Sequence, residues 1–149
     1  MTLPKIHEFK ISLKSKTKHS ELITIRNSED VARVCRKCMD TDSIDWIESM
    51  VVIGLNIANK VIGFYKVSQG GVSGTVCDPK IILQFALLSN SSLIIMCHNH
   101  PSGNLRPSHN DETLTLQIKQ AVSYFDIKLL DHVILTSDGY TSFSDEGIL

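Results

Sequence analysis

The chain has 149 residues, about the length of one globular domain and enough to bury a hydrophobic core. Its composition is that of an ordinary folded protein, with 42% hydrophobic and 21% charged residues, and its net charge of −1 gives no overall basic field for nucleic acid. The first 20 residues are locally basic, which we interpret as a solvent-exposed strand and loop rather than a nucleic-acid patch. The lysines concerned are Lys5, Lys10, Lys14, Lys16 and Lys18.

The sequence offers no sign of a membrane protein or of a disulfide-linked one. No apolar run approaches the ~20 residues of a membrane span, and the N-terminal segment lacks the apolar stretch of a signal peptide. We therefore expect a cytoplasmic protein with no membrane partner, whose four cysteines are free thiols. Cys35 and Cys38 form a single Cys-x-x-Cys pair, which we interpret as part of an apolar helix stripe rather than a redox or metal site.

The first 40 residues predict two strands and a helix. Residues 5–13 and 21–26 alternate loosely between apolar and polar residues, which is typical of strands. Ser28 is followed by acidic residues and by apolar residues at helical spacing. We therefore expect Ser28 to cap a helix that ends near Met39.

The rest of the chain predicts strands that alternate with helices. The predicted strands are residues 49–55, 60–67, 93–97, 127–136 and 140–143, of which 93–97 is a buried central strand and the last is an edge strand. One predicted helix begins at Asp78-Pro79 and ends near Leu88, and the other runs from Ser108 to about Tyr124. This mixture predicts an α/β fold in which helices cover a mixed sheet.

A group of metal-binding side chains follows the predicted central strand. His98 and His100 are two residues apart at its end, so their rings lie on one side and can converge on one ion. Ser108 and Asp111 are three apart at the start of the next helix and share a face, from which Asp111 could supply a third ligand. Two imidazoles and a carboxylate, with a fourth place left for water, are typical of a catalytic rather than a structural zinc site.

Each half of this pattern also has an ordinary explanation. A His-x-His pair is often unrelated to metal, and Ser108-x-x-Asp111 by itself resembles a helix-capping arrangement. Both explanations must hold independently to account for the joined spacing. The combination is therefore more specific for a metal site than either half.

The stretch HNHPSG at residues 98–103, with Pro107-Ser108 and Asp111, resembles the JAMM motif of JAB/MPN domains, in the RadC-like branch. The resemblance covers roughly residues 44–147 and extends to Asp131-His132-Val133-Ile134. It implies a three-layer α/β/α mixed sheet similar to that of cytidine deaminases, formed by residues 44–149. Residues 1–43 would then be N-terminal strands and a helix that are integral to the domain or lead into it.

The resemblance also implies a zinc-dependent metallopeptidase related to isopeptidases, which acts on a peptide or isopeptide-type substrate. His98, His100 and Asp111 would hold Zn²⁺, and Ser108 would donate a hydrogen bond to the developing oxyanion or to water at the metal. The family's catalytic acid/base is a glutamate at a strand start, and Glu48 matches it, eight residues before Asn56. His132, within an apolar strand, could be an outer partner of the metal ligands or a substrate contact, although such a residue is more often a packed histidine.

Some features depart from the family and keep an alternative open. RadC proteins usually carry an N-terminal helix-hairpin-helix region that the first 40 residues do not match, and Asp78 and Lys80 replace a frequent His and Arg. The alternative is a non-catalytic module that binds protein or DNA in repair or recombination. Nucleobase deamination is disfavoured, because it requires H-x-E and P-C-x-x-C, whereas Ser102 follows Pro101 here.

Overall fold

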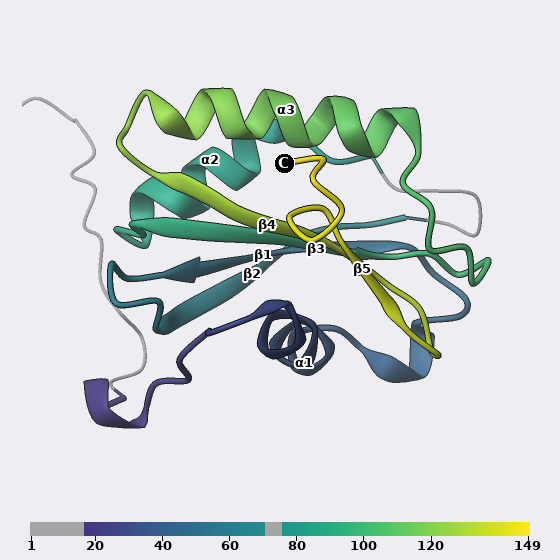
Figure 1. The fold of residues 1–149 in the computed structure, drawn as a ribbon, viewed down its shortest axis with the longest axis horizontal. Helices are drawn as coiled ribbons and strands as arrows, with labels where there is room; N and C mark the ends of the chain where they lie inside the picture. Colours follow the sequence, from purple (N-terminus) through teal and green to yellow (C-terminus); the bar gives the residue numbers. More distant parts are fainter. Residues whose placement is uncertain (1–16, 71–75) are drawn as a thin grey trace, which may run out of the picture.

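The computed structural model describes residues 17–70 and 76–149. Within these ranges, a five-stranded sheet lies between α1 on one face and α2 and α3 on the other (Figure 1), which confirms the predicted α/β/α layers. The strands are β1 (Ser49–Leu55), β2 (Val61–Gln69), β3 (Leu93–Asn99), β4 (Lys128–Leu135) and β5 (Tyr140–Ser142). The α-helices are α1 (Ser28–Cys38), α2 (Pro79–Leu88) and α3 (His109–Ser123), and short 3₁₀ helices span His19–Glu21 and Thr41–Ser43.

The sheet is mixed, with the order β2-β1-β3-β4-β5. β1 is antiparallel to β2 and β3, β3 is parallel to β4, and β5 is the antiparallel edge strand that the sequence predicts. β3 occupies the centre, which explains the uninterrupted apolar run of its residues 93–97. It extends two residues beyond its predicted end, so His98 lies inside the strand and His100 directly follows it.

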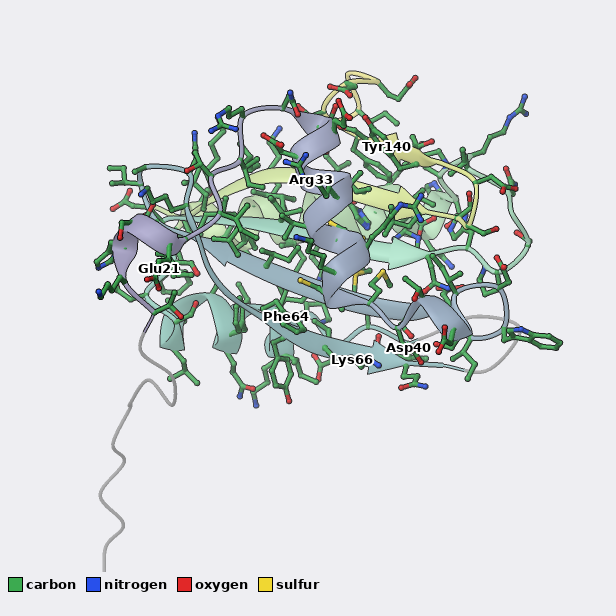
Figure 2. All side chains as sticks on the ribbon, turned by 90° about the horizontal axis from the view of Figure 1, so that it is seen from below. Glu21, Arg33, Asp40, Phe64, Lys66 and Tyr140 are labelled. Atoms are coloured by element: carbon green, nitrogen blue, oxygen red, sulfur yellow. The ribbon has the colours of Figure 1, made fainter. Side chains whose placement is uncertain are left out.

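Alternate residues of the strands contribute to two separate cores. On one face, Val51 and Cys97 pack against the buried side of α1. Figure 2 views the molecule from this side and shows α1 lying across the sheet. On the other face, Val52 and Met96 pack against α2 and α3. The alternation along β3 therefore sends Cys97 toward α1, and its neighbour His98 toward α3.

Cys35, Cys38 and Cys97 pack in the core on the α1 face of the sheet, as expected. Within the described residues all four are free, and Cys35 and Cys97 are buried. Burial, with a smaller contribution from Cys35, raises the pKa of Cys38 to about 12. A thiol with so high a pKa stays protonated at neutral pH, which agrees with packing rather than redox chemistry.

Two expectations for the segment before β1 are wrong. Residues 21–26 do not form a strand, because the segment contacts the sheet only through an isolated bridge between Thr24 and Lys60 and then turns into α1. The cap of α1 is Asn27 rather than Ser28: Asn27 has extended backbone angles, and its side chain accepts a 2.9 Å hydrogen bond from the nitrogen of Asp30. The strand predicted at residues 5–13 lies outside the described residues.

The described helices include none that is both long and apolar enough to cross a bilayer. The longest of them, α3, has 15 residues and carries charged and polar residues along its length. A membrane-spanning helix needs about 20 mostly apolar residues.

Candidate metal centre

The end of β3 supplies two of the site's side chains. His98 is fully buried on the face that α3 covers, and His100 follows the strand with a side chain that is 15% exposed. The nitrogen of His100 donates a 2.9 Å hydrogen bond to the carbonyl of Leu135, which holds this turn to β4. Gly103 then adopts a positive φ of 76°, a conformation that glycine takes without steric cost.

The start of α3 supplies the carboxylate. Ser108 is the N-cap: its Oγ accepts a 3.1 Å hydrogen bond from the nitrogen of Asp111, whose Oδ2 accepts from the nitrogen of Ser108 at 2.7 Å. This capping box fixes Asp111 at the helix start. The capping and metal interpretations are therefore compatible, because the carboxylate of Asp111 takes part in the capping box and also faces both imidazoles.

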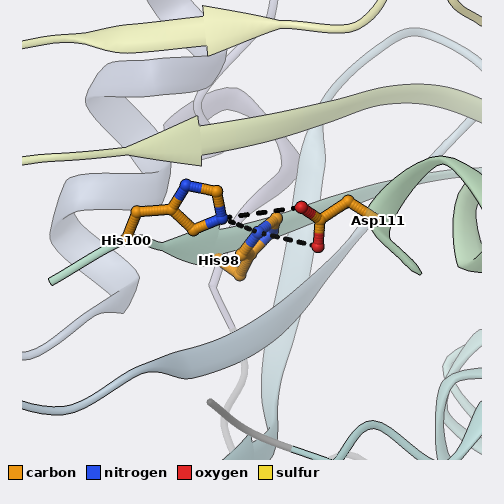
Figure 3. Close-up of side chains that lie close together, drawn as sticks. All are labelled: His98, His100 and Asp111. Atoms are coloured by element: carbon orange, nitrogen blue, oxygen red, sulfur yellow. Dashed lines mark hydrogen bonds and ion pairs between the residues drawn. The ribbon is translucent and has the colours of Figure 1, made fainter. Parts of the chain in front are cut away.

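The three side chains converge (Figure 3). The Nε2 atoms of His98 and His100 are 2.9 Å apart, and Asp111 places Oδ1 3.2 Å from His98 Nε2 and Oδ2 3.5 Å from His100 Nε2. One ligand atom from each residue lies within 4.8 Å of the others, so the group could hold a metal ion.

The electrostatics of the group show that it attracts positive charge. The hydrogen bond with Asp111 raises the pKa of His100 above its ordinary 6.5, against the opposing effect of burial. Burial raises the pKa of Asp111, but hydrogen bonds from His100 and His98 outweigh it and hold that pKa well below its usual range. The group therefore favours a positive charge, whether a proton on His100 or a metal cation.

Glu48 lies at the edge of this group. It immediately precedes β1, and the register that pairs Met50 with His98 places Glu48 across from His100. Glu48 is half-buried, and its negative charge contributes to the raised pKa of His100. A 2.8 Å hydrogen bond from the nitrogen of Gly70 to the carbonyl of Glu48 fixes its main chain.

The hydroxyl of Ser108 is already engaged. It donates its hydrogen to Oδ2 of Asp111 at 2.6 Å. A hydroxyl has one hydrogen, so donation to an oxyanion would require that hydrogen to turn from Asp111 to the substrate.

Two buried residues behind the imidazoles complete the site. His132 on β4 is fully buried, and its Nε2 lies 2.8 Å from Nδ1 of His98. Its Nδ1 lies 2.6 Å from Oγ1 of Thr115 on α3. The sequence analysis leaves the role of His132 open and misses Thr115. The available signal for Thr115 is its spacing, because it lies one helical turn after Asp111 and hence on the same face of the helix.

Comparison with known proteins finds a family model and relatives that match this chain. The family model for the RadC-like JAB domain matches residues 25–148. UPF0758 proteins are similar: that of Flavobacterium johnsoniae is 45% identical over 101 residues, covering 68% of this chain and 44% of the relative. That of Porphyromonas gingivalis is 44% identical over 103 residues, covering 68% and 45%. The chain therefore spans less than half the length of these relatives.

Proposed function

Since the chain belongs to the RadC-like JAB domain family, we propose that it is a zinc-dependent amide hydrolase whose metal is held by His98, His100 and Asp111. The family fold is broadly that of metal-dependent hydrolases. The observation that carries the proposal is the convergence of two imidazoles and one carboxylate at the end of β3.

The donor set fits zinc. Zinc bonds to nitrogen and oxygen are ~2.0–2.2 Å long, so ligand atoms at the corners of a tetrahedron stand about 3.3 Å apart. The two Nε2 atoms are 2.9 Å apart, Oδ1 of Asp111 is 3.2 Å from that of His98, and Oδ2 of Asp111 is 3.5 Å from that of His100. Either oxygen of Asp111 could therefore complete the group, in which one ligand atom from each residue lies within 4.8 Å of the others. Nδ1 of His100 donates to the carbonyl of Asn104 at 2.6 Å, because a carbonyl can only accept. In the neutral ring, the form that binds a metal, the lone pair is therefore on Nε2 and faces the site.

The residues around the ligands suit amide hydrolysis. Bound zinc would supply a Lewis acid that polarises a carbonyl and lowers the pKa of water. Glu48 accepts a proton from the attacking water and passes it to the leaving amine. Ser108 donates its hydrogen to the oxyanion that develops on the carbonyl oxygen.

We assign the substrate to the peptide or isopeptide class. The support is the HNHPSG motif and its likeness to the metallopeptidases of the JAMM type. The rival function, a non-catalytic module that binds DNA or protein in repair, has no need of a complete ligand set. All three ligands are present here.

Metal binding by the purified full chain tests the proposal. We expect about one zinc per wild-type chain, and an affinity more than ~100-fold weaker in His100→Ala, beyond the loss typical of an outer hydrogen-bond partner. His109→Ala is the matched control, because His109 is exposed at the first position of α3 and outside the ligand group. Wild type and His100→Ala with the same zinc affinity would contradict the site. DNA binding that survives chelation and weakens steeply with salt would favour the rival module.

A further inference from the structure

We infer that Thr115 and His132 are positioning residues, which turn the lone pair of His98 Nε2 toward the metal and thereby set the affinity for zinc. The inference deepens the proposed function and rests on its metal site. It concerns the line of hydrogen bonds that runs from Asp111 through Thr115 and His132 to His98.

The direction of every hydrogen bond in this line follows from Thr115. Its hydroxyl lies 2.5 Å from the carbonyl oxygen of Asp111, one turn earlier on α3. A carbonyl has no hydrogen, so Thr115 must donate its only hydrogen to Asp111. In its 2.6 Å contact with His132 the hydroxyl can therefore only accept, and the hydrogen comes from Nδ1 of His132.

The next bond is fixed in the same way. The ring of His132 is fully buried and contacts the rings of His98 and Phe143 and the hydroxyl of Thr115, so burial favours a neutral ring. A neutral imidazole with its hydrogen on Nδ1 carries a lone pair on Nε2. Nδ1 of His98, 2.8 Å away, must then be the donor, which leaves the lone pair of His98 on Nε2, the atom that faces His100 and Asp111.

The line also joins two metal ligands from different elements. His98 comes from β3 and Asp111 from α3, and Thr115 contacts the main chain of Asp111 while His132 contacts the ring of His98. Loss of the Thr115 hydroxyl would leave Nδ1 of His132 buried without an acceptor. Its ring would then turn or take the other tautomer, and His98 would lose its defined orientation.

Substitutions at Thr115 separate orientation from folding. Thr115→Val keeps the shape of the side chain and removes the hydroxyl, and Thr115→Ser keeps the hydroxyl. Thr113→Val is the matched control, because Thr113 donates the same kind of i−4 bond, 2.8 Å to His109, on the exposed side of α3. We expect zinc affinity, measured by competition with a chromogenic chelator, to fall ~10-fold or more in Thr115→Val and to stay near wild type in the other two.

Nitrogen NMR of histidine-labelled full chain, with and without zinc, provides a readout that folding alone would not move. We expect the hydrogen of His132 on Nδ1 in both states of the wild type, and a loss of this single tautomer in Thr115→Val. A hydrogen on Nε2 of His132 in the wild type, or wild-type zinc affinity in Thr115→Val, would overturn the inference. Wild-type protein that binds no zinc would overturn the proposed function instead, while the tautomers of the metal-free protein still decide the order of hydrogen bonds.

Discussion

The side-chain oxygen of Asn99 accepts a 2.8 Å hydrogen bond from the nitrogen of Ser49, the residue that follows Glu48. The side-chain nitrogen of Asn99 donates 2.8 Å to the carbonyl of Ile47, the residue before Glu48, and 2.7 Å to that of Ile44. Asn99 lies between the two histidines in the sequence but on the opposite face of β3. One buried amide therefore ties the main chain on both sides of Glu48 to the strand that carries His98.

Replacement of Asn99 by aspartate should loosen this connection. A carboxylate cannot donate to the carbonyls of Ile44 and Ile47, and it introduces a buried charge. We expect Asn99→Asp to lower the free energy of unfolding by about 1–3 kcal/mol, measured by urea denaturation. Asn110→Asp, at an exposed position in the first turn of α3, is the control and should unfold like the wild type. An unchanged urea midpoint in Asn99→Asp would show that the amide does not support the fold.

Glu48→Gln should separate metal binding from catalysis. The amide keeps the size of the side chain but cannot accept the proton of water, so we expect normal zinc affinity and ~10²–10⁴-fold slower hydrolysis. The measurement compares zinc-loaded proteins on a library of fluorogenic peptide amides. Glu29→Gln, at an exposed position in the first turn of α1, should keep the wild-type rate. Equal rates in wild type and Glu48→Gln would remove the acid/base role.

The metal-free protein should lose stability as the pH rises. His100 has a folded pKa raised above 6.5, so its pair with Asp111 stabilises the fold fully below pH 6.5, and this contribution is lost as the pH rises through the folded pKa. The lowered pKa of Asp111 gives the acid limit: its contribution is present above 3.8 and lost as the pH falls through the folded pKa. Urea unfolding in the presence of a chelator, over this pH range, checks both slopes.

Zinc affinity should change with pH in the opposite direction. Zinc displaces the proton that His100 holds, so we expect tighter binding as the pH rises through the folded pKa of His100. His100→Ala removes this proton and should flatten both the stability profile and the affinity profile. Zinc affinity that does not vary with pH above 6.5 would contradict direct ligation by His100.

Two paired glycines in the hairpin should respond differently to the same substitution. Gly54 on β1 pairs with Gly63 on β2, but a Cβ at Gly54 would collide with Oγ of Ser91 and lie 3.2 Å from the ring of Phe85. A Cβ at Gly63 meets nothing within 4 Å. We expect Gly54→Ala to lower the free energy of unfolding by about 1–3 kcal/mol and Gly63→Ala to leave it unchanged or slightly higher, by urea denaturation. Equal stability of the two variants would show that β1 and α2 can move apart at no cost.

The local sequence determined most of the elements and the candidate ligands. A continuous apolar run predicts β3, and Asp78-Pro79 and Ser108 predict the starts of α2 and α3, because an apolar run and a helix cap can each be recognised from a few neighbouring residues. Local spacing also predicts the ligands, because His98 and His100 are two residues apart at a strand end and Asp111 is three residues after the cap Ser108. Segment 21–26 shows the limit of such patterns, because its alternation is that of a strand but it makes a single bridge to Lys60.

Only the tertiary structure decided how the ligands are held. Asn99 reaches the segment around Glu48 across 50 residues of sequence, and Thr115 meets His132 across 17. Neither contact leaves a periodic or spacing signal, because both form between elements that the sheet order brings together. Sequence spacing can show which side chains face one way, but the hydrogen-bond partner that turns an imidazole is set by whichever strand or helix packs behind it.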